Sequence, residues 1–363
     1  MNKRIALFLP SLRGGGAERV MVDLAKGFSE KGYTVDLILA KAEGPYLSEL
    51  TSSIRVIDLA QPRVAFTLLG LIKYLRKEKP MALLATLNHV NVIAILATKL
   101  SGTSTRIIVR QANTLSTNSG GRLISLLVRF FYPFADKIVA VSSGVADDLV
   151  ATARVNRKTI EVIYNPIVNE ALYKKANESI DHPWFKAGGP PVVLSAGRLN
   201  AIKDFATLIA AVKLTKQIRP LRLMILGEGN CRKELETMIV SNKLEDDVLL
   251  PGFISNPFPF FKHCNLFVLS SISEGLPNAL IQSLALGVPV VSTDCPNGPN
   301  EILESGRWGK LVPIKKPQLM SEAILSTLEN SDNKQEDAKS SCKERFGVDS
   351  IVLKYIKIIM DQS

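Results

Sequence analysis

Residues 4–40 read RIALFLPSLRGGGAERVMVDLAKGFSEKGYTVDLILA: an apolar run, a glycine loop, a helical period and a second apolar run. The runs at 4–10 and 34–40 have the length and composition of buried strands, and 17–31 has the spacing of an amphipathic helix. Short apolar strands separated by such helices are typical of a parallel α/β sheet. The stretch therefore predicts a strand, a loop, a helix and a second, parallel strand.

The same alternation continues along the chain and then starts again. Further strands are predicted at 82–86, 106–110, 137–142 and 161–164 and, after a linker-like stretch at 165–191, at 192–196, 222–226, 248–250, 266–269 and 288–292. A chain of 363 residues exceeds the usual size of one hydrophobic core. We therefore predict two α/β domains, with the ligand site in the cleft between them, beyond the carboxyl ends of the strands.

Composition limits the class of protein. Apolar residues make up 46% of the chain, and no uninterrupted apolar run is long enough to span a bilayer or to act as a signal peptide. We expect a globular, cytoplasmic protein. The four cysteines lie far apart with no C-x-x-C pair, and there are only three histidines. This spacing predicts reduced thiols and disfavours a metal site.

Charge is unevenly distributed. Residues 1–180 hold 24 Lys and Arg against 14 Asp and Glu, whereas residues 181–363 hold 21 against 20. A balance of +10 in the first half favours an anionic partner, such as an acidic lipid surface or a pyrophosphate-bearing substrate, although such charge can also serve solubility alone. No helix-turn-helix, zinc-finger or aromatic-basic RNA motif is present, so we expect no nucleic-acid partner.

The first loop, residues 10–19, joins a strand to a helix through three glycines, Gly14, Gly15 and Gly16. Glycine lets the backbone approach a ligand closely, and the helix start offers N–H groups to a phosphate. A tight structural turn is the alternative. The dinucleotide fingerprint is broken, because Arg19 replaces its third glycine and Asp36 lies inside the next strand. This break disfavours an NAD-dependent oxidoreductase.

Two loops of the second half carry candidate catalytic residues. Arg198 follows the strand at 192–196 and Lys203 precedes the next helix, so the two cations can neutralise a diphosphate if they are more than solvated surface charges. Glu274 and Gln282 lie eight positions apart, about two helical turns. Free N–H groups around residues 275–280 can hold an anion, although Glu274 can instead be a plain N-terminal cap.

The order and spacing of these motifs resemble those of family 4 of the retaining glycosyltransferases, which have the GT-B architecture. The motifs cover almost the whole chain: the loop Gly14-Gly15…Glu18, then Ala196-Gly197-Arg198-Leu199…Lys203, Leu226-Gly227-Glu228-Gly229, Glu274-Gly275-Leu276-Pro277 and Gly287-Val288-Pro289-Val290-Val291. The resemblance implies two Rossmann-like α/β domains facing across a cleft. Residues 1–165 with a C-terminal helix at 345–363 would form the acceptor domain, and residues 166–344 the nucleotide-sugar donor domain.

The resemblance also implies an activity and the residues that carry it. The activity is transfer of a sugar from a nucleoside diphosphate donor, with retained α configuration and no metal or other cofactor. Arg198 and Lys203 would hold the diphosphate and Glu274 the sugar. The remaining donor-binding positions would be Gly15, Gly16, Gly227, Phe253 and Ile254 near the diphosphate and base, Gly275, Leu276, Pro277, Asn278, Ala279 and Leu280 near the sugar, and Gln282 on the ribose.

Two positions depart from the family pattern. Gln282 stands where the family has a second glutamate, so two-point carboxylate binding of the ribose diol is lost, although an amide can still donate and accept. Residues 110–113, Arg-Gln-Ala-Asn, stand where many members have a histidine beside the reacting sugar. His89 is a candidate substitute, but a lone histidine is more often structural. We therefore assign no general base, because the leaving diphosphate can itself accept the proton of the acceptor.

The resulting hypothesis is a hexosyl- or N-acetylhexosaminyltransferase of cell-surface polysaccharide synthesis, with UDP as the favoured donor base and a lipid-linked glycan as acceptor. A nucleotide-sugar epimerase would need no separate acceptor. A non-catalytic nucleotide-sugar-binding subunit, suggested by Gln282, would bind donor without turnover. Product analysis separates the three.

Residues 121–132, GRLISLLVRFFY, mix arginine with leucine and aromatic residues. This composition is typical of a helix that lies on an anionic membrane surface. It also fits an ordinary helix whose apolar residues pack against the sheet. The first alternative predicts a protein that binds peripherally to the inner face of the cell membrane.

Overall fold

A computed structural model describes residues 3–116, 121–330 and 334–361. The chain forms two compact units, which we call unit 1 (Met1–Pro166 with Phe346–Ser363) and unit 2 (Ile167–Arg345). Each internal bound lies one residue after the bound expected from the sequence. No helix within the described ranges is long and apolar enough to cross a bilayer.

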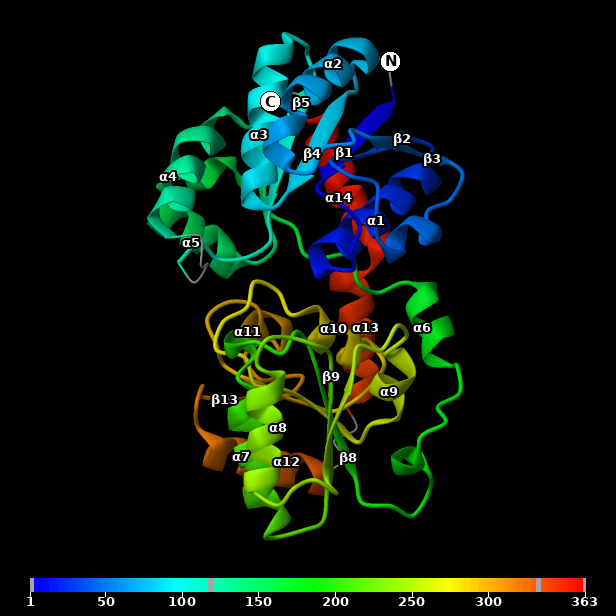
Figure 1. Cartoon of the computed structure of the whole chain (residues 1–363), viewed down its shortest axis with the longest axis vertical. Coiled ribbons are helices and arrows are strands. Elements are labelled where there is room, and N and C mark those ends of the chain that lie inside the picture. Colours follow the sequence, from blue (N-terminus) through cyan, green and yellow to red (C-terminus); the bar gives the residue numbers. More distant parts are fainter. Residues whose placement is uncertain (1–2, 117–120, 331–333, 362–363) are drawn as a thin grey trace. The chain divides into compact units, whose positions relative to one another are not determined.

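Unit 1 is built on a seven-stranded parallel sheet in the order β3-β2-β1-β4-β5-β6-β7 (Figure 1). Its strands are β1 (Arg4–Leu9), β2 (Thr34–Leu39), β3 (Ile54–Asp58), β4 (Ala82–Thr86), β5 (Arg106–Gln111), β6 (Lys137–Ala140) and β7 (Ile160–Val162). The central strands β1 and β4 are almost wholly apolar and buried, as expected for a sheet covered on both faces.

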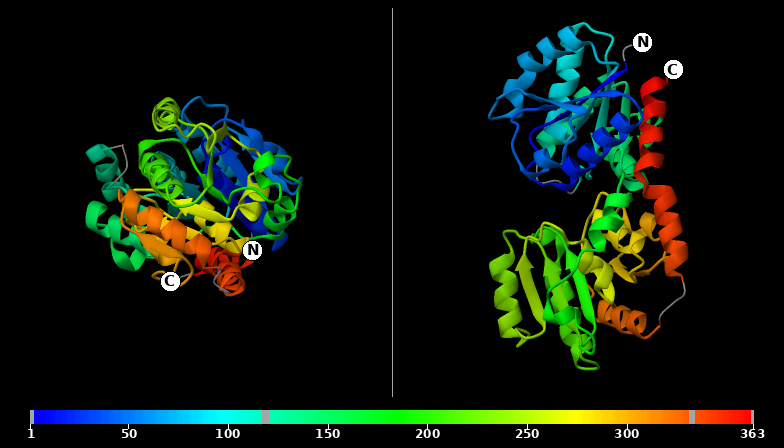
Figure 2. Two further views of the ribbon diagram at one scale, coloured as in Figure 1. Left: turned by 90° about the horizontal axis from the view of Figure 1, so that it is seen from below. Right: turned by 90° about the vertical axis from the view of Figure 1, so that its right-hand side faces the viewer.

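The helices of unit 1 cover both faces of this sheet. They are α1 (Gly16–Glu30), α2 (Leu68–Glu78), α3 (Asn88–Ser101), α4 (Gly121–Phe131), α5 (Ser143–Ala153) and α14 (Val348–Met360). Helix α14 packs against α1, while α2, α3, α4 and α5 form a chain of neighbours; Figure 2 shows α14 in red and the α2–α3 pair in blue and cyan on opposite sides. Gly27 permits the α1–α14 packing, because a Cβ there would lie 2.4 Å from Cγ2 of Val352.

Unit 2 repeats the plan with a six-stranded parallel sheet in the order β10-β9-β8-β11-β12-β13. Its strands are β8 (Val192–Ala196), β9 (Arg222–Leu226), β10 (Val248–Gly252), β11 (Leu266–Leu269), β12 (Val290–Thr293) and β13 (Lys310–Val312). Its helices are α6 (Glu170–Ala176), α7 (Phe205–Lys216), α8 (Arg232–Ser241), α9 (Phe258–His263), α10 (Asn278–Ala285), α11 (Pro299–Ile302), α12 (Pro317–Glu329) and α13 (Gln335–Phe346). One apolar core joins the sheet to α7, α8 and α12.

The predicted fold class is confirmed, with local corrections. Every predicted strand is present, but β3 and β13 were missed, and the expected linker at 165–191 contains α6. The segment expected as one C-terminal helix from residue 345 is instead the end of α13, a break at Gly347 and α14. Gly347 has extended backbone angles, so the helix cannot run through it.

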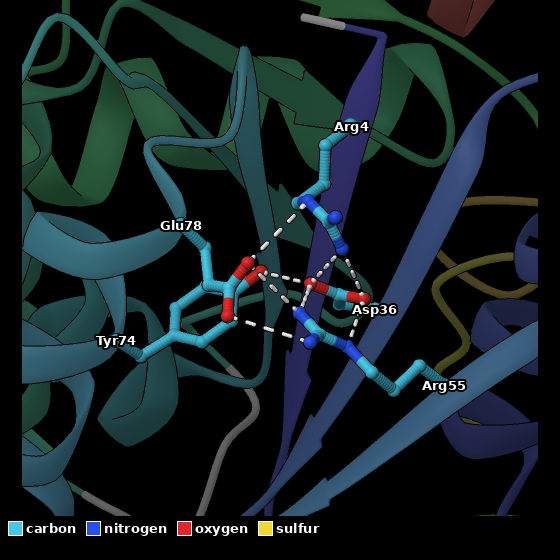
Figure 3. Close-up of polar contacts among 5 residues, drawn as sticks. All are labelled: Arg4, Asp36, Arg55, Tyr74 and Glu78. Atoms are coloured by element: carbon cyan, nitrogen blue, oxygen red, sulfur yellow. Dashed lines mark hydrogen bonds and ion pairs between the residues drawn. The ribbon is translucent and has the colours of Figure 1, made fainter.

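Asp36, in the middle of β2, is fully buried and bound by three side chains (Figure 3). Arg4 and Arg55 donate to its carboxylate at 2.9 and 2.6 Å, and the Tyr74 hydroxyl donates at 2.6 Å. Burial alone would raise the pKa of this carboxyl, but the three donors outweigh it and lower the pKa of Asp36 below its usual range. Asp36 thus joins three strands and α2, and has no free oxygen for a ribose.

We expect Asp36→Asn to lower the free energy of unfolding of unit 1 by about 2 kcal/mol, less than for a wholly buried pair because both arginines remain partly exposed. The carboxylate stabilises the fold above its unfolded-state pKa of about 3.9, and this contribution disappears as pH falls through its lower folded-state pKa. Urea titration between neutral and acid pH measures both effects, with exposed Asp58→Asn as the control. Equal stability of the two variants would contradict the assignment.

Candidate functional site

The candidate site lies at the carboxyl edge of the unit 2 sheet, where the strand order reverses. Strands β8 and β11 are neighbours there, although β9 and β10 intervene in the sequence. Arg198 and Lys203 follow β8, and Glu274 follows β11. Ligands of open α/β sheets bind at such a switch point, so the topology brings the three predicted catalytic residues to the expected edge.

Lys203 and Glu274 form an ion pair across this switch point, with 2.6 Å between Nζ and Oε1. The lysine backbone is held on both sides. The Ser270 hydroxyl donates to the Lys203 carbonyl at 2.7 Å, and the Lys203 N–H donates to Asn200 Oδ1 at 3.2 Å. The ammonium group is therefore held at a defined position.

Glu274 is oriented from its own loop. The Ser271 hydroxyl donates to its carboxylate at 2.6 Å, and its backbone N–H donates to the Pro296 carbonyl at 3.4 Å. Pro277 occupies the N-cap position of α10, so the alternative that Glu274 is the helix cap is wrong. Burial, together with the charge of Glu274, raises the pKa of the neighbouring Cys295 thiol to about 12, which keeps that cysteine protonated.

Arg198 is exposed, and within the described ranges its guanidinium makes no hydrogen bond or ion pair. Lys203 and Glu274 neutralise each other, so of these three residues Arg198 carries the positive charge that is not paired. A diphosphate would meet the planar donor of Arg198 directly and would share Lys203 with Glu274.

The glycines of the neighbouring loops have a steric role. Gly227 has a φ of +136°, and a Cβ there would lie 2.0 Å from the Gly197 carbonyl oxygen. Its N–H donates to the Gly252 carbonyl at 2.8 Å. The structure thus explains Gly227 by close packing of two loops, and its predicted contact with donor stays a prediction.

Phe253 and Ile254 come directly after β10, the outer strand beyond β9, at the same carboxyl edge. The Phe253 ring is exposed and Ile254 is half-buried. An exposed ring here can stack on a base, because every base has an aromatic face.

Both halves of the chain match known protein families. The model for glycosyl transferases group 1 matches residues 177–345, and the model for glycosyltransferase family 4 matches residues 14–170. This chain is 32% identical, over 94% of each chain, to an enzyme of Campylobacter jejuni, the N-acetylgalactosamine-N,N'-diacetylbacillosaminyl-diphospho-undecaprenol 4-alpha-N-acetylgalactosaminyltransferase. The chain is a family 4 glycosyltransferase. An alpha-1,4-N-acetyl-D-galactosaminyltransferase of the same organism, which acts on GalNAc-alpha-(1->4)-GalNAc-alpha-(1->3)-diNAcBac-PP-undecaprenol, is 26% identical, over 99% of this chain and 98% of its own.

The GT-B fold of this glycosyltransferase is shared with solved structures. The Anabaena protein HepE in complex with UDP superposes with a TM-score of 0.82 at 20% identity, over 98% of each chain. At that identity the likeness establishes the fold alone, so the roles of individual residues rest on the contacts and burial of the site.

Helix α10 of the glycosyltransferase offers fewer N–H groups than its sequence suggested. Leu276 and Leu280 are buried in the core, and the Leu280 N–H donates to the Pro277 carbonyl at 3.1 Å. Gly275 is buried in the loop before the helix, while Asn278 and Ala279 are partly exposed in the first turn. The expectation of a free N–H at Leu280 is therefore wrong, because Pro277 already accepts that bond.

Gln282 lies on α10 and is half-buried. Its amide makes no hydrogen bond within the part of the chain that the structure describes. The group is therefore available to a ligand, and its assignment to the ribose stays a prediction.

The glycine loop of unit 1 is already occupied by a carboxylate of the glycosyltransferase itself. Gly14 N–H and Gly15 N–H both donate to Glu18 Oε2, at 2.8 and 3.1 Å, as in a capping box. The expectation that Gly15 presents a free N–H to phosphate is therefore wrong for this conformation. Gly16, the first residue of α1, is exposed.

At the carboxyl edge of unit 1, the two residues Arg110 and Gln111 that stand near the family's histidine position are engaged in hydrogen bonds and offer no general base. Arg110 is fully buried and donates to Thr86 and Asn165, while Gln111 accepts from the Tyr132 hydroxyl at 2.8 Å. His89 lies at the start of α3, just past β4, and partial desolvation lowers its pKa, so the imidazole is neutral at pH 7. Because of its position just past β4, His89 stays a candidate general base.

Sequence reasoning missed the residues that hold the Lys203–Glu274 pair. Ser270 and Ser271 orient Lys203 and Glu274, yet serine after a strand is too common to signal such a role.

Within residues 3–116, 121–330 and 334–361, no three His, Cys, Asp or Glu residues are grouped as metal ligands.

Proposed function

We propose that this glycosyltransferase moves a hexose or N-acetylhexosamine from a nucleoside diphosphate donor, with UDP the favoured base, to a glycan carried on a lipid diphosphate. We propose further that the transfer retains the α configuration, needs no metal and belongs to cell-surface polysaccharide synthesis at an anionic membrane surface. The observation that carries the proposal is the Lys203–Glu274 pair beside exposed Arg198 at the unit 2 switch point. The names of both Campylobacter relatives support the acceptor, and the UDP complex of HepE supports the donor base.

The roles of the three residues follow from where charge develops in the transition state. As the sugar–phosphate bond breaks, negative charge builds on the leaving diphosphate and positive charge on the anomeric carbon. Arg198 and Lys203 stabilise the first charge and Glu274 the second, and Lys203 and Glu274 are already held in place before the reaction. In a front-face transfer the departing phosphate oxygen takes the proton of the acceptor hydroxyl, so no protein base is required.

Donor binding and product formation test this proposal together. UDP-, GDP- and ADP-sugars are screened for a rise in thermal stability, since ligand at 100 times its Kd adds about 2.7 kcal/mol. The selected donor is then incubated with a lipid-diphosphate glycan, with and without a chelator. We expect one lengthened lipid-linked product, formed at the same rate with and without the chelator. Donor binding without turnover would instead indicate a binding subunit, and an isomerised free donor an epimerase.

We expect Gln282→Ala to raise the donor Michaelis constant with little change in kcat, because contacts to a ribose are present before and during the reaction. Gln282→Glu should keep activity or tighten donor binding, since a carboxylate can accept from both ribose hydroxyls. Steady-state kinetics measures both variants. A folded but inactive Gln282→Glu enzyme would show that position 282 does not face the ribose.

A further inference from the structure

Helix α4 turns an apolar stripe toward solvent. Leu123, Leu126, Leu127 and Phe130 follow the i, i+3, i+4, i+7 spacing of one helix face, and they are 68, 59, 36 and 65% exposed. Phe134, in the 3₁₀ turn that follows, is 49% exposed. In a globular protein this spacing normally marks the face that packs on the core. The packing alternative for these residues is therefore wrong. The side chain of Arg122 lies outside the described part of the chain.

The helix is anchored by its other face. Val128 and Tyr132 are fully buried, and the Tyr132 hydroxyl bonds to Asn91 and Gln111. Helix α4 lies beside α3 and α5 (Figure 1). The Phe130 ring packs edge-on against Phe131 and Phe134. The exposed stripe is therefore a fixed surface and does not depend on a loose helix end.

Charge identifies the partner. The 57 residues from 79 to 135, which include all of α3 and α4, contain no Asp or Glu, so neither helix carries a carboxylate that would repel an anionic partner. Arg129 is exposed beside the stripe. Of the acidic residues on flanking elements, Asp136 and Asp148 accept backbone N–H groups, and Asp147 is exposed on α5.

We propose that α4 docks unit 1 on an anionic lipid surface, with the stripe of Leu123, Leu126, Leu127, Phe130 and Phe134 in the acyl–headgroup boundary and Arg129 at the phosphates. Amphipathic helices with leucine and phenylalanine on one face and basic residues beside it bind in this way. A second copy of this chain fits poorly, since residues 1–180 hold 24 basic and 14 acidic residues and would repel their copy. The inference rests on the proposed function, since it names the surface that would bring this glycosyltransferase to a membrane. Binding to lipid needs neither donor nor acceptor, so it can be measured apart from the transfer reaction.

Vesicle sedimentation tests the proposal. Full-length protein is mixed at low salt with vesicles of phosphatidylcholine alone or with phosphatidylglycerol added. We expect preferential binding to the anionic vesicles, weakening as salt rises. The double variant Leu126→Glu/Phe130→Glu should lower the partition coefficient by about 100-fold or more, because each side chain loses its apolar burial in the lipid. Arg129→Glu should lower it by about tenfold.

The matched control is Ile218→Glu/Val240→Glu, which makes the same charge change at two exposed apolar residues of unit 2. It should bind like wild type, and both double variants should unfold at the wild-type temperature because all four side chains are exposed. Three results would overturn the proposal: equal or no binding to the two vesicle types, full binding by the α4 double variant, or a concentration-dependent dimer that this variant abolishes. None of these results bears on sugar transfer, which is measured separately.

Discussion

Lys203→Ala slows turnover by about a hundredfold or more, the usual cost of losing a charge partner of the transition state. The ammonium group faces the switch point from a backbone fixed by Ser270 and Asn200. Its loss also leaves the Glu274 carboxylate without its ion-pair partner at the site where an anionic diphosphate must bind. We therefore expect Lys203→Ala to impair the enzyme more than Arg198→Ala, although Arg198→Ala should also lose about a hundredfold.

Initial rates at saturating donor measure these losses, and thermal unfolding checks the fold. Lys213→Ala is the matched control, because Lys213 is an exposed lysine of α7 whose Nζ contacts Asn242. Near-normal turnover of the Arg198 or Lys203 variant, with unchanged stability, would show that the residue is only a solvated surface charge.

Glu274→Gln lowers kcat by about a hundredfold while changing donor affinity much less. The amide keeps the size of the side chain but cannot stabilise positive charge at the anomeric carbon, a loss felt mainly in the transition state. The substitution also frees Lys203 from its ion pair, so the diphosphate should bind as well as before or better. A fall in kcat with an unchanged or lower donor Michaelis constant is the expected signature.

The control for this substitution is Glu236→Gln, which removes a carboxylate from α8, where Glu236 pairs with Arg232. It should retain wild-type kinetics. A fully active Glu274→Gln enzyme would remove Glu274 from the mechanism, and a rise in the Michaelis constant alone would make it a simple binding residue.

The sequence was sufficient for the fold wherever strands are short, apolar and buried. Strands β4, β8, β9 and β11 were predicted with the bounds that the structure shows. Strand β3 was missed because its residues, IRVID, alternate charge with apolar side chains on a partly exposed edge. Strand β13 was missed because it has only three residues, too few to show the two-residue alternation of a strand.

The site was predictable as a set of residues but not as a set of contacts. Lys203 and Glu274 are 71 positions apart, and only the reversal of strand order makes them neighbours. Glu18 was assigned to a motif, yet its bonds to Gly14 and Gly15 depend on a loop conformation that residue types do not specify. The α4 stripe has the period of a core helix, and no periodicity states which side of a helix meets the sheet.

Retaining transfer to a lipid-linked glycan is tested most sharply by following the anomeric proton during one reaction. Wild-type protein, the donor chosen by thermal screening and a lipid-diphosphate glycan are mixed, and proton NMR records the new glycosidic bond as it forms. We predict an α-linked product, formed in step with nucleoside diphosphate release and at the same rate in the presence of a chelator. A β-linked product, or release of free sugar with no new glycosidic bond, would contradict the proposed transfer.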